Sequence, residues 1–179
     1  MKYISILRGI NVSGQKKINM LELKSLYESL GFKNVVTYIQ SGNVIFDSTD
    51  KKIPDLKSRI EKAIDKKYKC HVPVEIRTRL ELKNIIKNNP FSPVDLAAEG
   101  TKVLVTFLCS KPTKTEIANL YKYVVSPEKL VVKGTEVYLY CPNGYGKSKL
   151  SNNFLENKLG VVATTRNWKS VYKLYELAN

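Results

Sequence analysis

Residues 35–46, Val-Val-Thr-Tyr-Ile-Gln-Ser-Gly-Asn-Val-Ile-Phe, contain two short β-forming runs joined by a polar turn. The run Val35–Gln40 is rich in β-branched and aromatic side chains, and Val44–Phe46 continues the pattern after Ser41-Gly42-Asn43. A connection this short closes an antiparallel hairpin, whereas a parallel crossover needs about a dozen residues or more. The stretch therefore excludes a doubly wound parallel sheet here.

The segments on either side of this hairpin complete a split β-α-β order, which predicts a ferredoxin-like lobe over residues 1–79. Its sheet is expected to be antiparallel, with the helices on one face. Pro73 places the last strand at a sheet edge, because proline cannot donate a ladder hydrogen bond. The expected elements are a strand at Tyr3–Leu7, a helix at about Met20–Leu30 capped by Asn19, the hairpin, a helix at about Pro54–Lys67, and a strand at Val72–Ile76.

The second half repeats this order less regularly, so the chain is predicted to be an α+β protein of two related lobes. Residues 80–100 are expected to form a bridging helix, at about Leu80–Lys87, and a loop rich in proline and serine. The second lobe is expected over residues 101–179. Its expected elements are a strand at Lys102–Cys109, a helix at Lys114–Tyr123, a hairpin of Leu130–Lys133 with Glu136–Tyr140, a helix at about Lys149–Lys158, the apolar run Val161–Ala163, and a C-terminal helix from Asn167 to about Leu177.

Composition indicates a globular protein, with 43% hydrophobic and 26% charged residues among 179. No stretch approaches the ~20 apolar residues of a spanning helix, and Met1–Ser5 lacks a signal-peptide layout, so a cytoplasmic protein with no membrane partner is expected. The cysteines, Cys70, Cys109 and Cys141, and the single histidine, His71, lack metal-site spacing. We therefore expect buried reduced thiols and no metal or cofactor.

Charge is the one unusual bulk property, with a net charge of +14 and an isoelectric point near 9.6. Such an excess favours phosphate-bearing or other acidic partners. Most lysines are spread along predicted helices, as between Lys57 and Lys69, where a solvated face also accounts for them. Charge alone therefore does not distinguish a nucleic-acid-binding protein from a basic cytosolic protein.

The polar tract Arg8–Lys17 follows the first strand, and Ser41–Asn43 follows the second. In a split β-α-β lobe these two strands run parallel, so both turns are expected at one edge of the sheet. Cations and amide groups there suit an anion, although turn chemistry alone also accounts for Gly42 and for a positive φ at Asn43. The candidate ligand-binding residues are Arg8, Gly9, Asn11, Gly14, Lys16, Lys17, Ser41, Gly42 and Asn43.

Two further segments carry weaker signals. Gly144–Ser148 resembles part of a phosphate-binding loop, but Cys141 stands where that motif needs a glycine, so a helix entry capped by Ser148 or Ser151 is preferred. Weak anion contact through Lys147 and Lys149 stays open. Near the C-terminus, an aromatic stripe at helical spacing predicts core packing, whereas Arg166 and Asn167 point elsewhere and join the candidate ligand-binding residues.

Catalysis finds little support, because His71 is the only histidine and no nucleophile-elbow sequence exists. No catalytic residue is predicted, and whether the protein is an enzyme is left open.

Three blocks resemble the motifs of a bacterial family called domain of unknown function 1697. They are Leu7-Arg8-Gly9-Ile10-Asn11-Val12-Ser13-Gly14, Tyr38-Ile39-Gln40-Ser41-Gly42-Asn43-Val44 and Ala163-Thr164-Thr165-Arg166-Asn167-Trp168. Ser13 departs from the glycine that is usual in this family. The resemblance implies a two-lobed α+β fold and groups Arg8, Asn11, Ser41, Asn43, Arg166 and Asn167 as one surface. It implies no activity, substrate or cofactor.

The leading hypothesis is a binding protein for a phosphate-bearing ligand, either a nucleotide or a nucleic acid, at the loop edge of the first lobe. In this hypothesis Arg166–Trp168 closes a cleft between the lobes. The alternatives are an enzyme of unknown reaction using that cleft and a protein-interaction module. The oligomeric state is not predicted.

Overall fold

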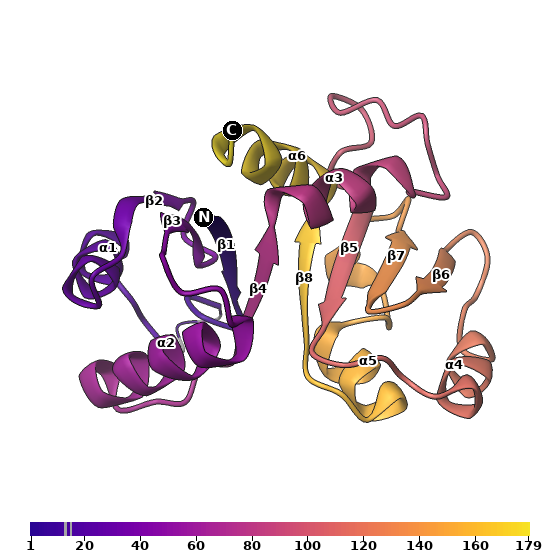
Figure 1. Cartoon of the computed structure of the whole chain (residues 1–179). Coiled ribbons are helices and arrows are strands. Elements are labelled where there is room, and N and C mark those ends of the chain that lie inside the picture. Colours follow the sequence, from indigo (N-terminus) through magenta and orange to yellow (C-terminus); the bar gives the residue numbers. More distant parts are fainter. Residues whose placement is uncertain (13, 15) are drawn as a thin grey trace. The chain divides into compact units, whose positions relative to one another are not determined.

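The computed structural model describes residues 1–12, 14 and 16–179, which form two compact units. The first unit comprises Met1–Lys83 with Leu174–Asn179, and the second comprises Asn84–Lys173. Each unit holds a four-stranded antiparallel sheet and helices (Figure 1). The predicted two-lobed α+β fold is confirmed.

The first unit has the predicted split β-α-β order. Its sheet runs β2-β3-β1-β4, and every neighbouring pair of strands is antiparallel. The strand β4 lies at an edge directly after Pro73, as that proline predicts. The elements are β1 (Lys2–Leu7), α1 (Met20–Ser29), β2 (Lys33–Tyr38), β3 (Asn43–Asp47), α2 (Ile53–Tyr68), β4 (Val74–Thr78) and the start of α3 (Arg79–Lys87), which continues into the second unit from Asn84.

The second unit has the same topology, with the sheet order β6-β7-β5-β8. Its elements are β5 (Val103–Leu108), α4 (Lys114–Tyr121), β6 (Lys129–Lys133), β7 (Glu136–Tyr140), a 3₁₀ turn at Tyr145–Lys147, α5 (Asn152–Leu159), β8 (Ala163–Asn167) and the start of α6 (Trp168–Leu177), which continues into the first unit from Leu174. The second unit therefore repeats the strand order of the first, with β5, β6, β7 and β8 in the places of β1, β2, β3 and β4.

The strand β8 corrects the sequence prediction, which ended the apolar run at Ala163 and began a helix at Asn167. Residues from Ala163 to Asn167 pair with β5 along its length, from Leu108 to Leu104. The polar composition hid this strand, but its two threonines are β-branched and therefore favour extended backbone. The helix α6 begins one residue later than predicted.

Helix α5 begins at Asn152, three residues after the predicted start. The Ser151 side chain accepts a hydrogen bond from the Phe154 amide and caps the helix, which confirms one of the two expected caps. Leu150 is fully buried just before the cap, so the chain enters the core before it becomes helical. Asn19 likewise caps α1, as predicted.

The core of the first unit lies between the sheet and the helices α1 and α2. Phe46 on β3 stands at its centre, with its ring centroid 4.5 Å from that of Phe32, 5.4 Å from that of Tyr27 and 5.8 Å from that of Tyr3. The Tyr27 hydroxyl lies 2.8 Å from the Ser5 hydroxyl, which satisfies two buried polar groups. Both helices thus cover one face of the sheet, as predicted.

The core of the second unit is built in the same way. Leu104 and Leu108 of β5, with Val137 and Leu139 of β7, pack with apolar side chains of α4 and α5. The opposite faces of both sheets are also buried, as at Ile4 of β1 and Val105 of β5. Burial on both faces explains why the central strands read as nearly continuous apolar runs.

Equivalent backbone hydrogen bonds mark the repetition of one unit by the other. In each unit, the backbone amides at the end of the first strand donate one hydrogen bond to the hairpin turn and one to the segment before the last strand. The corresponding pairs are Leu7 N to Gly42 O (2.8 Å) with Leu108 N to Thr135 O (2.8 Å), and Arg8 N to Pro73 O (2.9 Å) with Cys109 N to Val162 O (3.0 Å).

The three cysteines do not share one environment. Cys141 is buried, Cys70 is half-buried and Cys109 is exposed, and all three are free thiols. The expectation of buried reduced thiols therefore holds for Cys141 alone, and Cys109, which directly follows the last residue of β5, is exposed. Within the described residues, no helix has the length and apolar character needed to cross a bilayer.

A carboxylate that bridges two cations is buried at the edge of the first sheet. Glu75 on β4 accepts a hydrogen bond from Lys57 Nζ of α2 at 2.6 Å and from Arg77 Nη1 at 2.9 Å. The side chains of Glu75 and Arg77 are each 9% exposed. Because the interior screens charge poorly, removing one member of such a cluster leaves the others at a large energetic disadvantage.

We predict that Glu75→Ala lowers the free energy of unfolding by about 3 kcal/mol, since Lys57 and Arg77 lose their shared carboxylate. Glu28→Ala is the control, because Glu28 pairs with Lys24 at 3.8 Å on the exposed surface of α1. That change should alter stability by about 0.5 kcal/mol or less. Urea denaturation measures both, and equal losses in the two variants would contradict the prediction.

Candidate functional site

Three segments meet at the end of the first sheet where β1 terminates. We call these segments the first-unit rim and define it as residues 8–19, 39–43 and 69–73. The Arg8 amide donates to Pro73 O, the Leu7 amide donates to Gly42 O, and Lys16 Nζ donates to His71 O at 2.8 Å. The predicted meeting of the first two segments is therefore present in the structure, and Ser13 and Gln15 lie outside the described residues.

Asn11 holds the long loop of the rim together. Its side-chain nitrogen donates to Ile18 O at 3.0 Å and to Gln40 O at 2.8 Å, and its side-chain oxygen accepts from the Ile18 amide at 2.9 Å. Its backbone amide donates to Lys16 O at 3.2 Å. The amide group that sequence alone offered for a ligand is thus engaged in closing the loop and joining it to the hairpin turn.

Gly42 permits the two turns to approach closely. A Cβ atom at this position would lie 2.6 Å from Ile10 Cδ1 and 2.8 Å from Leu7 Cβ, and the φ angle of Gly42 is +77°. Both the backbone conformation and the space therefore require glycine. Gly9 and Gly14 also have positive φ, but no atom lies within 4 Å of a Cβ built on either.

The hairpin turn is closed by its own polar side chains. Asn43 is fully buried, and its side-chain nitrogen donates to Tyr38 O at 3.1 Å and to Ser41 Oγ at 3.0 Å. The positive φ angles of the turn belong to Ile39 and Gly42, so the positive φ predicted for Asn43 is wrong. Asn43 instead begins β3 in extended conformation, because it pairs with Ile6 of β1.

The charge of the rim has a single sign. Its three segments carry Arg8, Lys16, Lys17 and Lys69, together with His71, and contain no aspartate or glutamate. Lys17 and Lys69 are exposed, and Arg8 and Lys16 are half-buried. Because no carboxylate of the rim offsets these charges, the local potential favours an anion.

The segment 69–73 was not among the predicted site residues. It joins the rim because β4 is antiparallel to β1, so the start of β4 lies beside the end of β1. The predicted topology contained this information. Lys69 and His71 could therefore have been assigned to the rim from the strand order alone.

Arg166 and Asn167 have structural roles in the second unit. Arg166 lies on β8, is 8% exposed, and its Nη1 donates to Thr164 Oγ1 at 3.0 Å and to Thr165 O at 2.8 Å. Burial lowers the pKa of this guanidinium to about 10, so it stays charged at neutral pH. Asn167 Oδ1 accepts from the Ser170 amide and caps α6. The prediction that Arg166 is one of the freer residues is therefore wrong, because its side chain is almost fully buried on β8.

Arg77 occupies the equivalent position in the first unit. It pairs in register with Ile4 of β1, as Arg166 pairs with Val105 of β5. Arg77 Nη1 also donates to the carbonyl of the preceding residue and to the side chain two residues before it, Glu75. This shared arrangement accounts for the buried position of Arg166 as part of the repeated architecture.

The sequence profile of the family described as "Protein of unknown function (DUF1697)" matches residues 1–138. The chain belongs to this family. The match includes the whole first-unit rim and ends before β8, so the C-terminal block that contains Arg166 lies beyond it.

A solved structure of a conserved bacterial protein from Streptococcus pneumoniae is similar along nearly the whole chain. It shares 22% sequence identity, has a TM-score of 0.74, and the similarity covers 99% of this chain and 98% of that protein. At this identity the comparison establishes the fold. Among curated proteins, none matches the chain.

We predict that Gly42→Ala destabilises the protein by roughly 2–4 kcal/mol, because the added methyl group meets both Leu7 and Ile10 in a strained backbone conformation. Gly9→Ala is the matched control, since its φ is +66° but its Cβ meets no atom within 4 Å. That variant should lose about 1 kcal/mol. Chemical denaturation compares the two; a Gly9→Ala loss as large as that of Gly42→Ala would show that close packing at Gly42 is not limiting.

Proposed function

We propose that the protein binds a phosphate-bearing ligand, a nucleotide or a nucleic acid, at the first-unit rim. The observation that carries the proposal is the length and charge of the loop that follows β1. Residues 8–19 connect β1 to α1, whereas the second unit makes the equivalent connection with residues 109–113. The fold therefore needs about five residues where the first unit has twelve.

The additional length carries the chemistry expected of an anion site. Arg8, Lys16 and Lys17 supply positive charge, and no acidic residue occurs between Arg8 and Asn19. Longer connections with ordered polar groups are where folds usually place binding functions. An insertion that served only to fill space would not need to concentrate cations of one sign.

The described residues of the loop are held by contacts within the first unit. Asn11 closes its neck through four hydrogen bonds, and the side chains of Ile10 and Ile18 on either side are buried in the core. Lys16 is held against His71 O by its ammonium group, which retains further donors. A ligand therefore pays little conformational entropy to organise these cations.

We expect a labelled DNA duplex to bind with an affinity that falls as salt increases. The variant Arg8→Ala/Lys16→Ala/Lys17→Ala should bind roughly tenfold or more weakly, and its salt slope should fall by about 0.9 for each phosphate that the variant no longer neutralises. Fluorescence anisotropy at several salt concentrations gives both quantities. ATP, tested in the same way by competition, distinguishes a nucleotide from a nucleic acid as the preferred ligand.

The control is Lys51→Ala/Lys62→Ala/Lys66→Ala, which removes the same number of charges from exposed positions outside the rim. Both variants should give the same dispersed amide spectrum as the wild type. Equal binding by the two variants would assign the affinity to net charge and remove the rim as a site. Absence of any binding to DNA or ATP by the wild type would overturn the proposal as a whole.

A further inference from the structure

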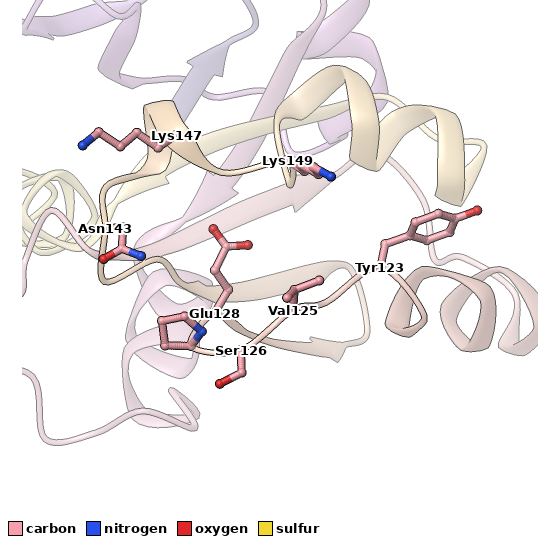
Figure 2. A pocket seen from close by; sticks show the side chains of 8 residues that line it. Tyr123, Val125, Ser126, Glu128, Asn143, Lys147 and Lys149 are labelled. Carbon is pink, nitrogen blue, oxygen red and sulfur yellow. The ribbon is translucent and has the colours of Figure 1, made fainter.

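The second unit contains a pocket of about 530 Å³, formed entirely by two of its loops (Figure 2). This volume is in the range of small-molecule sites. The lining residues come from the loop between α4 and β6 and from the loop between β7 and α5. They are Tyr123, Val125, Ser126, Pro127, Glu128, Asn143, Lys147 and Lys149.

Both loops are longer than their counterparts in the first unit. Residues 122–128 connect α4 to β6, where residues 30–32 connect α1 to β2. Residues 141–151 connect β7 to α5, where residues 48–52 connect β3 to α2. The first unit forms the same fold with shorter loops at both places. The fold therefore does not require the longer loops that form the pocket.

In the loop between β7 and α5, the residues on either side of Lys147 and Lys149 are anchored to the second unit. The Tyr145 hydroxyl lies 3.3 Å from Thr165 Oγ1 of β8, and burial raises the pKa of Tyr145, which keeps the hydroxyl protonated. Leu150 is fully buried, and its amide donates to Ser148 Oγ at 3.0 Å. Lys147 and Lys149 lie between these anchors, so the backbone that carries them is positioned in advance.

The pocket lining carries two cations and one carboxylate. Figure 2 shows the side chains of Lys147 and Lys149 extending in opposite directions. Lys147 and Lys149 are exposed and Glu128 is half-buried. Figure 2 shows the Glu128 carboxylate directed toward the loop that carries the two lysines, with Asn143 to one side of it. In the part of the chain that the structure describes, these three ionic groups form no ion pair with one another.

Tyr123 lies at one end of the pocket lining, and its ring makes several contacts outside the pocket. Lys158 Nζ donates to the Tyr123 hydroxyl at 3.0 Å and lies 4.2 Å from the Tyr123 ring centroid, and Phe154 packs edge-on against the same ring at 5.4 Å. The hydrogen bond and the charge of Lys158 lower the pKa of Tyr123. Tyr123 is therefore held in place by Lys158 and Phe154.

We infer that this pocket binds a small, hydroxyl-bearing phosphate ester of the size of a mononucleotide. Lys147 and Lys149 match the charge of a phosphate dianion, and Glu128 with Asn143 accepts hydrogen bonds from hydroxyl groups of the ligand. The Glu128 carboxylate opposes a polyanion, because a nucleic-acid backbone would bring several phosphates close to it. This site shares no residue with the first-unit rim. It also differs from the rim in containing a carboxylate.

The test uses AMP and ribose 5-phosphate as probes, with adenosine and inorganic phosphate as comparisons. We expect AMP to shift the amide resonances of Val125, Gly144 and Gly146 in a ¹H–¹⁵N spectrum of the full chain. Lys147→Ala/Lys149→Ala should weaken AMP binding at least about tenfold, because two charge-assisted hydrogen bonds to the phosphate are removed. Glu128→Gln should weaken AMP and ribose 5-phosphate while leaving inorganic phosphate unchanged.

Lys111→Ala/Lys114→Ala is the matched control, since it removes two exposed lysines from the same unit outside the pocket. It should give the same AMP-induced shifts of Val125, Gly144 and Gly146 as the wild type does, and the rim variant Arg8→Ala/Lys16→Ala/Lys17→Ala should keep these pocket shifts too. Equal affinity in the two double-lysine variants, or no resonance shift at the pocket at millimolar AMP, would overturn the inference. Shifts confined to the rim and abolished in the rim variant would overturn it too, while supporting the proposed function.

The lysines at 147 and 149 have exposed side chains, so their replacement should leave the spectrum dispersed and the comparison valid. If Lys147→Ala/Lys149→Ala does not fold, Lys147→Gln/Lys149→Gln retains side-chain length without charge and gives the same test. Binding of adenosine with the affinity of AMP would also contradict the inference, because the phosphate would then contribute nothing.

Discussion

The pairing of β1 on both of its sides is the constraint on which the first unit depends. β1 is antiparallel to β3 along one edge and to β4 along the other, so its end fixes the position of two further segments. The amides of Leu7 and Arg8 donate to Gly42 and Pro73, one on each side. The rim exists because a central strand must bring the hairpin turn and the start of the last strand to the same edge.

Repetition of this unit within one chain separates what the fold needs from what has been added. The corresponding strands carry the same hydrogen bonds at their ends, and Arg77 and Arg166 occupy the same register on the outer strands. The connections differ instead. The first unit has the longer loop after its first strand, and the second unit has the longer loops after its first helix and third strand. Each unit thus serves as a reference for the other.

Most of the fold could be predicted from the sequence, because local signals and topology agree. The short turn at Ser41–Asn43, the cap at Asn19 and the proline before β4 each pointed to the observed arrangement. The strand β8 was missed, because two threonines, an arginine and an asparagine give no apolar alternation. Its burial is decided by pairing with β5, which is a long-range interaction.

The candidate sites were predictable to different degrees. The meeting of Arg8–Lys17 with the hairpin turn followed from strand directions, but the engagement of Asn11 and Asn43 within the turns did not, since hydrogen-bond partners depend on the folded backbone. The pocket of the second unit could not be found in advance, although Lys147 and Lys149 stood out. It depends on where the separate segment 122–128 lies in the folded unit.

The unequal exposure of the thiols has a practical consequence. A maleimide reagent reacts with an accessible thiolate, so it should modify Cys109 first, at the end of β5, and reach Cys141 slowly, because burial both covers that thiol and raises its pKa. Cys109 follows β5 as Arg8 follows β1. A fluorophore or spin label could therefore be placed on the second unit without introducing a cysteine, at the position that corresponds to the rim of the first.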